Sequence, residues 1–139
     1  MESAVTLLVW NRLGSIGVRA MDDQHGVLMD TLADLRLALV QGAGRDRVRK
    51  EMRRLVEFTR MHFDSEERLL EQQGFPELAA HRDAHERLLG LVCEVAKRAE
   101  HTDGAEMLAA AGVLRGWYTE HVEQLDRGCG EWLNERGIV

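Results

Sequence analysis

Seven side chains combine the residue types and the intervals of a metal site inside a helical protein. Five are histidines and two are carboxylates: His25, His62, Glu66, His81, His85, His121 and Asp126. Imidazole nitrogens and carboxylate oxygens suit first-row metals such as iron, zinc or copper. Because seven inward ligands are too many for one ion with open positions, we interpret them as the ligands of two metal ions.

Four long helices are needed to position these ligands. The chain has one proline, and its glycines cluster between long stretches with helical periodicity. We expect helices near residues 20–40, 45–72, 77–100 and 104–127, the last with a short continuation through Leu133. An irregular arm, residues 1–19 with Trp10, Ile16 and Val18, is expected to lie across them. Short connections make neighbouring helices antiparallel, so the predicted fold is an all-α, up-down-up-down four-helix bundle with an N-terminal arm and a short C-terminal helical extension.

Apolar residues and proposed ligands share one stripe of each expected helix. The stripe of the second helix consists of Met52, Leu55, Thr59, His62, Glu66 and Leu69. Steps of three and four residues keep one side of a helix turned toward its neighbours, so the ligands should face inward. Asp126 does not fit this pattern, because five residues after His121 correspond to about 140° around an ideal α-helix. Spacing alone therefore does not place Asp126 in the site.

The distribution of the proposed ligands indicates a metal site that can bind an exogenous ligand. His62 with Glu66, and His81 with His85, are four residues apart and can each grip one centre from a single helix face. A closed shell of four ligands is typical of structural zinc. Seven ligands shared by two ions instead leave room for an exogenous ligand.

Length, composition and charge limit the classes of protein to consider. The 139 residues, 45% of them apolar, suffice for one domain, which we assign to residues 1–139. A net charge of -6 disfavours binding to nucleic acid or to an anionic membrane surface. The apolar run 4–10 is too short for a membrane span and shows no cleavage pattern, so we expect a cytoplasmic protein.

The remaining residues capable of chemistry are expected to have ordinary roles. Cys93 and Cys129 each follow a proposed ligand by eight residues on antiparallel helices, which places the thiols roughly 12 Å to either side of the site, too far apart to pair. We therefore predict two packing or surface thiols. His101 matches no motif and should lie at the surface between the third and fourth helices. Glu67 should be solvated, or pair with Arg68 or a neighbouring helix.

Five sequence blocks in order resemble the hemerythrin family, specifically its single-domain bacterial members. They are Trp10 and Gly17; Asp23-Gln24-His25; His62-Phe63 with Glu66-Glu67; Gly74-Phe75-Pro76 followed by His81 and His85; and Trp117 with His121 and Asp126. The resemblance extends over nearly the full chain. A single H-x-x-x-H is weak evidence, but all blocks at family-like intervals form a specific pattern.

The resemblance implies a pair of irons joined by an oxo or hydroxo group. One iron would be bound by His81, His85 and His121, and the other by His25 and His62, with Glu66 and Asp126 bridging. The iron with two histidines would keep an open position, where dioxygen binds in the family. A tight apolar pocket then protects bound oxygen from water. The matching wall positions here are Leu28, Phe63, Trp117, Tyr118 and Val122.

Tyr118 departs from the family pattern, which usually has leucine there. Its hydroxyl could donate a hydrogen bond or relay a proton to bound oxygen and so shorten the life of the oxygenated form. Alternatively, the ring packs while the hydroxyl points to solvent or to a backbone carbonyl. The sequence does not decide between these two roles.

Three classes of function compete. The first is reversible dioxygen binding for storage, delivery or sensing, with a separate electron donor. The second is a di-iron redox enzyme that consumes peroxide, dioxygen or nitric oxide, which only Tyr118 favours. The third, a metal buffer or structural protein, fits poorly with an open coordination position. Ferritin-like di-iron enzymes carry Glu-x-x-His, which occurs nowhere in this chain. The oligomeric state is left open.

Overall fold

The structure of the protein is a computed structural model that describes residues 15–139. Residues 1–14, which include Trp10 and most of the predicted arm, lie outside the described residues. The helices of the described part are, in chain order, α2 (Arg19–Val40), α3 (Arg45–Gln73), α4 (Leu78–Arg98), α5 (Gly104–His121), the π-helical turn η1 (Val122–Asp126) and α6 (Arg127–Glu135). The stretch predicted as one helix over 104–127 is thus interrupted by a π-helical turn.

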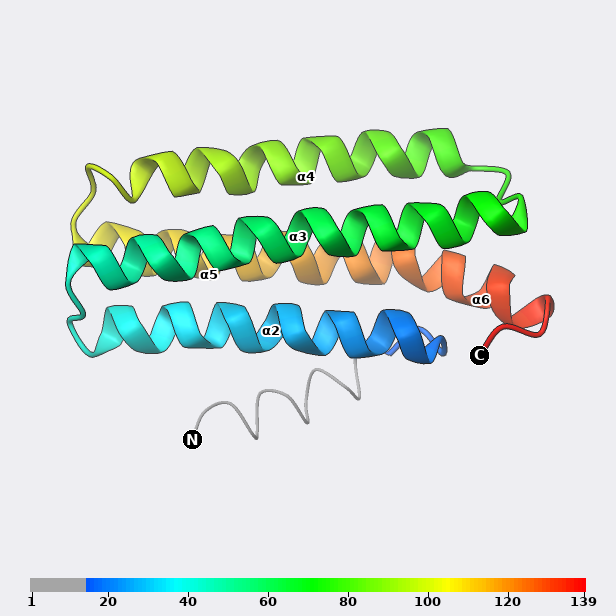
Figure 1. Ribbon diagram of the computed structural model, residues 1–139, viewed down its shortest axis with the longest axis horizontal. Coiled ribbons are helices and arrows are strands. Elements are labelled where there is room, and N and C mark those ends of the chain that lie inside the picture. The colour runs from blue at the N-terminus through cyan, green and yellow to red at the C-terminus, as the bar shows by residue number, and fades with distance from the viewer. Residues whose placement is uncertain (1–14) are drawn as a thin grey trace.

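The four long helices form an antiparallel bundle (Figure 1). Each helix packs against the next one along the chain, and α5 closes the ring by packing against α2. The predicted all-α, up-down-up-down bundle is confirmed, and α6 is its C-terminal extension. Because alternate helices run in opposite directions, the beginnings of α2 and α4 lie at the same end as the final parts of α3 and α5 (Figure 1). Six of the seven predicted ligands belong to these four segments, and Asp126 ends η1, which follows α5.

Local sequence signals set the ends of the helices that hold these ligands. Gly74 terminates α3 in the left-handed conformation with a φ of 73°, and the Phe75 N–H returns to the carbonyl of Leu70 at 2.9 Å. Pro76 follows immediately, so the chain turns before α4. Asp103 caps α5 through a side-chain oxygen that accepts the Glu106 N–H at 3.0 Å.

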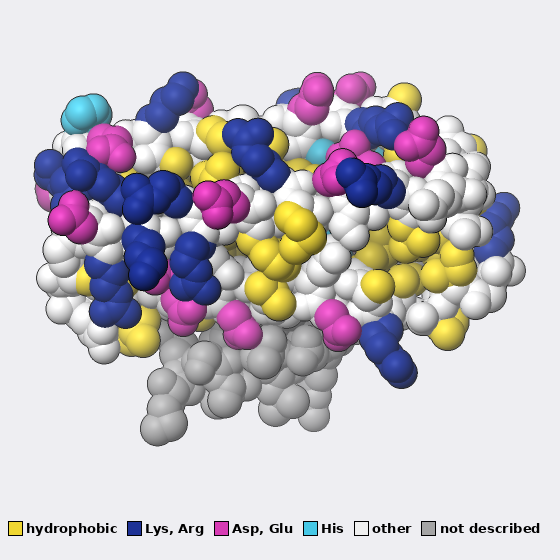
Figure 2. All heavy atoms as spheres, in the orientation of Figure 1, with side chains coloured by type: hydrophobic (Ala, Val, Ile, Leu, Met, Phe, Trp, Pro, Cys, Tyr) yellow, Lys and Arg dark blue, Asp and Glu magenta, His cyan; other side chains and the backbone are white. Residues whose placement is uncertain are grey.

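Large apolar side chains fill the bundle between the helices. Leu35, Leu55, Val92 and Leu114, one from each long helix, have no exposed surface. Five of the six histidines are also buried, and little histidine is visible on the face shown in Figure 2. The interior therefore combines an ordinary apolar core with an unusual concentration of imidazoles.

The segment before α2 packs against α6 near the end of the chain. Ile16 is buried, and its carbonyl lies so close to Gly130 that a Cβ added to this glycine would be 2.1 Å from the Ile16 oxygen. Asn134 also donates a hydrogen bond to the Gly17 carbonyl at 2.9 Å. These contacts fasten α6 to the start of the described chain.

We predict that Gly130→Ala destabilises the protein by about 1–3 kcal/mol, because a methyl group cannot fit beside the Ile16 carbonyl without backbone movement. Gly128→Ala is a matched control two residues earlier in the same helix. It meets nothing within 4 Å and should stabilise α6 by up to about 1 kcal/mol. Urea unfolding of both variants measures the difference. Equal stability of the two variants would show that the close approach is unimportant.

Candidate metal centre

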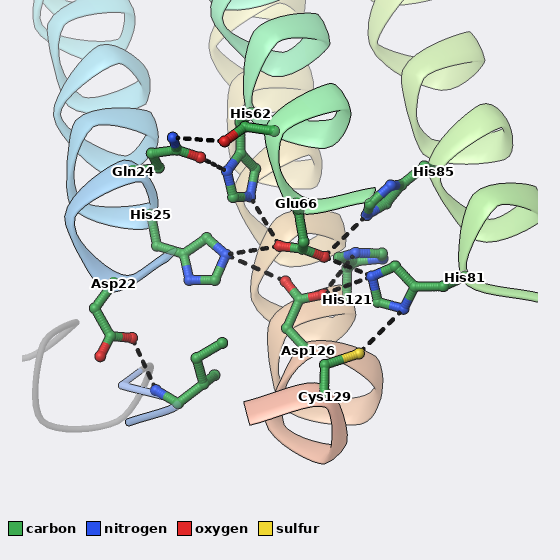
Figure 3. A network of polar contacts seen from close by, with 12 residues as sticks. Asp22, Gln24, His25, His62, Glu66, His81, His85, His121, Asp126 and Cys129 are labelled. Carbon is green, nitrogen blue, oxygen red and sulfur yellow. Dashed lines mark hydrogen bonds and ion pairs between the residues drawn. The ribbon is translucent and has the colours of Figure 1, made fainter. Parts of the chain in front are cut away.

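The seven predicted ligands converge in the middle of the bundle and form two groups with shared members (Figure 3). The first group consists of Glu66, His81, His85, His121 and Asp126, and the second of His25, His62, Glu66 and Asp126. Within each group the potential ligand atoms lie within 4.8 Å of one another. The structure therefore brings together every residue that the sequence singled out, with both carboxylates common to the two groups.

Each carboxylate divides its two oxygens between the groups. Glu66 Oε1 lies 2.5 Å from His81 Nε2 and 3.2 Å from His85 Nε2, whereas Oε2 lies 3.4 Å from His62 Nε2. Asp126 repeats the pattern, with Oδ1 3.2 Å from His121 Nε2 and Oδ2 3.2 Å from His25 Nε2. Each carboxylate thus directs one oxygen toward the first group of histidines and the other oxygen toward the second group. This is the arrangement needed to bridge two cations.

The interior atoms of this cluster make few hydrogen bonds. Glu66 Oε2, both oxygens of Asp126, and the Nε2 atoms of His85 and His121 are buried without a hydrogen-bond partner. Buried polar atoms without partners are costly, and most proteins avoid them. Lone pairs of nitrogen and oxygen that point at a common centre suit metal ions, so the residues present fit a metal site.

A π-helical turn brings Asp126 onto the same side as His121. At the end of η1 the Arg127 N–H bonds to the carbonyl of Val122, five residues earlier. In a π-helix the fifth residue replaces the fourth as hydrogen-bond partner, so five residues make close to one turn. The angle of about 140° for five residues of an ideal α-helix therefore does not apply between His121 and Asp126. Asp126 thus lies in the cluster where the family resemblance led us to expect it, and the backbone device that places it there was not predicted.

Residues outside the cluster orient three of the imidazoles through their Nδ1 atoms. Gln24 Oε1 lies 2.7 Å from His62 Nδ1, and Glu67 Oε2 lies 2.7 Å from His85 Nδ1. The third contact, at 3.5 Å, joins Cys129 Sγ to His81 Nδ1. Such partners fix the ring plane and direct Nε2 toward a metal.

One of these orienting residues, Cys129, contradicts the expectation from sequence, and another, Glu67, agrees with one of the alternatives. Cys129 was predicted to lie roughly 12 Å from the site as an ordinary thiol, and this is wrong because α6 follows the π-helical turn and directs it at His81. Glu67 contacts the neighbouring helix, one of the alternatives foreseen, and also binds Arg82 at 3.2 Å. Cys93 is half-buried near Arg60, and His101 is exposed in the turn after α4.

The expected pocket-wall residues come from several helices and are at least partly buried. Leu28, Phe63, Tyr118 and Val122 are buried, and Trp117 is half-buried. Phe63 stacks on His85 with ring centroids 3.9 Å apart and parallel planes. Phe63 therefore covers part of the cluster with an apolar ring.

The Tyr118 hydroxyl is already engaged by the protein. It contacts the Thr59 hydroxyl, which itself donates to the Leu55 carbonyl at 2.7 Å. Since the Thr59 proton is used in that bond, Tyr118 must donate to Thr59. Burial also raises the pKa of Tyr118, so the phenol stays protonated. The partner is a threonine hydroxyl, rather than the solvent or backbone carbonyl considered from sequence.

Protonation of the metal-free site follows from burial and charge. Burial and the nearby Asp126 charge oppose ionisation of Glu66, but contacts with His25, His81 and His85 lower its pKa to about 2. Burial would lower the pKa of His25, yet contacts with Asp126 and Glu66 raise it to about 9. His62, in contrast, has its pKa lowered to about 4 by burial. Burial would also lower the pKa of His81, but contacts with Asp126, Cys129 and Glu66 raise it to about 12. At neutral pH the carboxylates are charged, and His25 and His81 carry compensating protons.

Comparison with known proteins agrees with this geometry. The family model described as "Hemerythrin HHE cation binding domain" matches residues 16–133. The chain belongs to the hemerythrin family. This match spans all seven clustered residues, so the resemblance noted from five sequence blocks is confirmed.

Individual members of the family match most of the chain. A bacteriohemerythrin of Stenotrophomonas maltophilia is 34% identical over 128 residues, covering 91% of this chain and 82% of that protein. A bacteriohemerythrin of Methylococcus capsulatus is 26% identical over 113 residues, covering 81% and 86%. A crystal structure of wild-type hemerythrin aligns with a TM-score of 0.76 and 25% identity, over 86% of this chain and 92% of the other.

No helix among residues 15–139 is both long and apolar enough to cross a membrane. This finding applies to the bundle and its C-terminal extension.

We predict that metal affinity rises with pH between about 6.5 and 9. The protonated form of His25 stabilises the metal-free fold below its ordinary pKa of 6.5, and this contribution is lost as pH rises through about 9. A metal ion must displace that proton, so affinity should increase by about tenfold per pH unit for each proton displaced. Zn(II) competition titrations at three pH values, with a pH indicator to count released protons, measure this.

The exposed His101 supplies the control for this experiment, because His101→Ala removes a histidine that does not belong to the cluster. The variant should show the same pH dependence as the wild type. An affinity that stays constant across this pH range would show that neither His25 nor His81 is protonated in the metal-free protein.

Proposed function

We propose that this hemerythrin is a non-haem di-iron protein that binds dioxygen reversibly, for storage, delivery or sensing. The observation that carries the proposal is the unequal division of ligands between the two groups. One group offers five residues and the other four, with Glu66 and Asp126 counted in both. With one further oxo or hydroxo bridge, octahedral irons would have six and five ligands. The open position would then belong to the iron bound by His25 and His62.

When bound, such an iron pair supplies two electrons and one open coordination position to dioxygen. The chain's part is to hold the ligands rigidly and to exclude water. Gln24 fixes His62 on the open side through its 2.7 Å contact, and Gln24 is itself held by a hydrogen bond of 3.2 Å to Ser65. We assign the apolar wall of the dioxygen pocket to Leu28, Phe63, Trp117, Tyr118 and Val122, most of which are buried.

The enzymatic alternative loses the feature that favoured it. A redox enzyme acting on peroxide, dioxygen or nitric oxide needs protons delivered to bound oxygen. Tyr118 was the only residue in the sequence that suggested such delivery, and its hydroxyl donates to Thr59 instead. A separate electron donor would keep the irons reduced. The cytoplasmic location of the protein remains a prediction from sequence.

We predict two irons per chain after anaerobic reconstitution, and a saturable spectral change when the diferrous protein is mixed with dioxygen in a stopped-flow instrument. Removing dioxygen should restore the starting spectrum. His121→Ala should lower iron content, since it removes a buried ligand, whereas His101→Ala should leave it unchanged. One iron per chain would refute the paired centre, and immediate irreversible oxidation would refute reversible binding.

We predict that Tyr118→Phe leaves the autooxidation rate of the oxygenated form within about twofold of the wild type, because the hydroxyl does not face bound oxygen. The variant should lose about 0.5–1.5 kcal/mol of stability with the hydrogen bond to Thr59. Thr59→Val removes the other partner and serves as the control. Autooxidation slowed about tenfold in Tyr118→Phe, but not in Thr59→Val, would instead make Tyr118 a proton donor to the site.

A further inference from the structure

We propose that Cys129 is a positioning residue for His81, and that its sulfur accepts the hydrogen bond which directs this imidazole at the metal. The inference rests on the proposed di-iron function, because it assigns a role to a residue behind one of the ligands. Cys129 does not itself belong to either group of potential ligands.

The two nitrogens of His81 face different surroundings. Nε2 points at the carboxylates, 2.5 Å from Glu66 Oε1 and 3.1 Å from Asp126 Oδ1. Nδ1 points the opposite way, 3.5 Å from Cys129 Sγ (Figure 3). When Nε2 binds a metal, the remaining proton of a neutral imidazole resides on Nδ1. The Nδ1–H must then donate to the sulfur.

The other oriented imidazoles have stronger acceptors. His85 has the carboxylate of Glu67 and His62 the amide oxygen of Gln24, both at 2.7 Å. A thiol sulfur accepts a hydrogen bond more weakly and at a longer distance. A strong hydrogen-bond acceptor raises the basicity of a ligating imidazole. His81 should therefore bind a metal more weakly than His85 does, although both belong to the same group of potential ligands.

The backbone holds the thiol in place. Cys129 is 1% exposed, and it lies three residues after Asp126, just beyond the π-helical turn. The next residue, Gly130, packs against the Ile16 carbonyl. The π-helical turn before Cys129 and the close contact of Gly130 after it therefore fix the position and orientation of the sulfur.

A cleft behind His81 gives the ring somewhere to move if this contact is lost. The cleft has a volume of about 340 Å³ and lies between the start of α4 and α6, lined by Phe75, Ala80, His81, Gly128, Cys129 and Trp132 among others. His81 is buried at the edge of this cleft, so its ring could turn toward the cleft if the contact with the sulfur were lost. The sulfur is the acceptor that meets Nδ1 on this side.

Two substitutions separate positioning from packing. Cys129→Val retains a side chain of similar size and removes the acceptor. Cys129→Asn is larger and polar, but its carbonyl oxygen extends beyond the sulfur position and suits the shorter length of an N–H···O hydrogen bond. Packing alone predicts that Val is nearly harmless and Asn damaging. Positioning predicts the opposite order for metal binding.

The experiment titrates each metal-free protein with Co(II) under anaerobic conditions and follows the visible absorption of the bound ion. Urea unfolding of the same metal-free samples measures stability separately. We expect Cys129→Val to lower Co(II) affinity about 10–100-fold, the usual effect of losing an outer partner of a ligand. Cys129→Asn should stay within about threefold of the wild type, even though its metal-free form is the less stable.

Cys93→Val is the matched control, since Cys93 is half-buried on the same helix as His81 and away from the cluster. It should bind Co(II) like the wild type. Equal affinities of the wild type and Cys129→Val would overturn the role of Cys129, as would a sulfur-to-cobalt charge-transfer band that Cys129→Val abolishes. One Co(II) per wild-type chain would instead contradict the paired centre of the proposed function.

Discussion

Two carboxylates buried side by side in the centre of the bundle are the constraint on which the rest of the structure depends. Glu66 and Asp126 have 1% and 0% of their surface exposed, and each charge disfavours the other. An isolated buried carboxylate would take up a proton to escape this cost. Here five imidazoles surround the pair, and their contacts keep both carboxyl pKa values below the ordinary range. The site is thus an anionic centre held ready for cations.

This constraint reaches every long helix. The members of the cluster come from α2, α3, α4, α5 and the π-helical turn. A shift of any of these helices relative to the others would therefore change the geometry of the cluster. Ions bound here would join all four helices, and their binding energy would add to the stability of the fold. The apolar half of the interior, with Leu35, Leu55, Val92 and Leu114, aligns the helices before any metal is considered. Packing and coordination therefore reinforce one geometry.

The sequence predicted the parts that obey helical periodicity. The stripe through Leu55, His62 and Glu66 placed the ligands of α3 inside, and their burial agrees with it. It could not place Asp126, because the required π-helical turn leaves no periodic signal. The error over Cys129 had the same origin, since distances along an ideal α-helix ignore the changed register. The partner of Tyr118 was also beyond reach, because Thr59 is 59 residues away in sequence.

The π-helical turn is equivalent to an α-helix with one residue inserted. It separates α5 from α6, so that equivalent side chains of the two helices point in different directions. Everything from Arg127 onward is rotated by about 100° relative to a continuous helix, the angle that one α-helical residue contributes. Asp126 ends the turn that causes this rotation, and Gly130 meets the Ile16 carbonyl after it. A single extra residue therefore sets both the position of Asp126 in the cluster and the contact of α6 with the segment before α2. A chain without this extra residue would lose both features together.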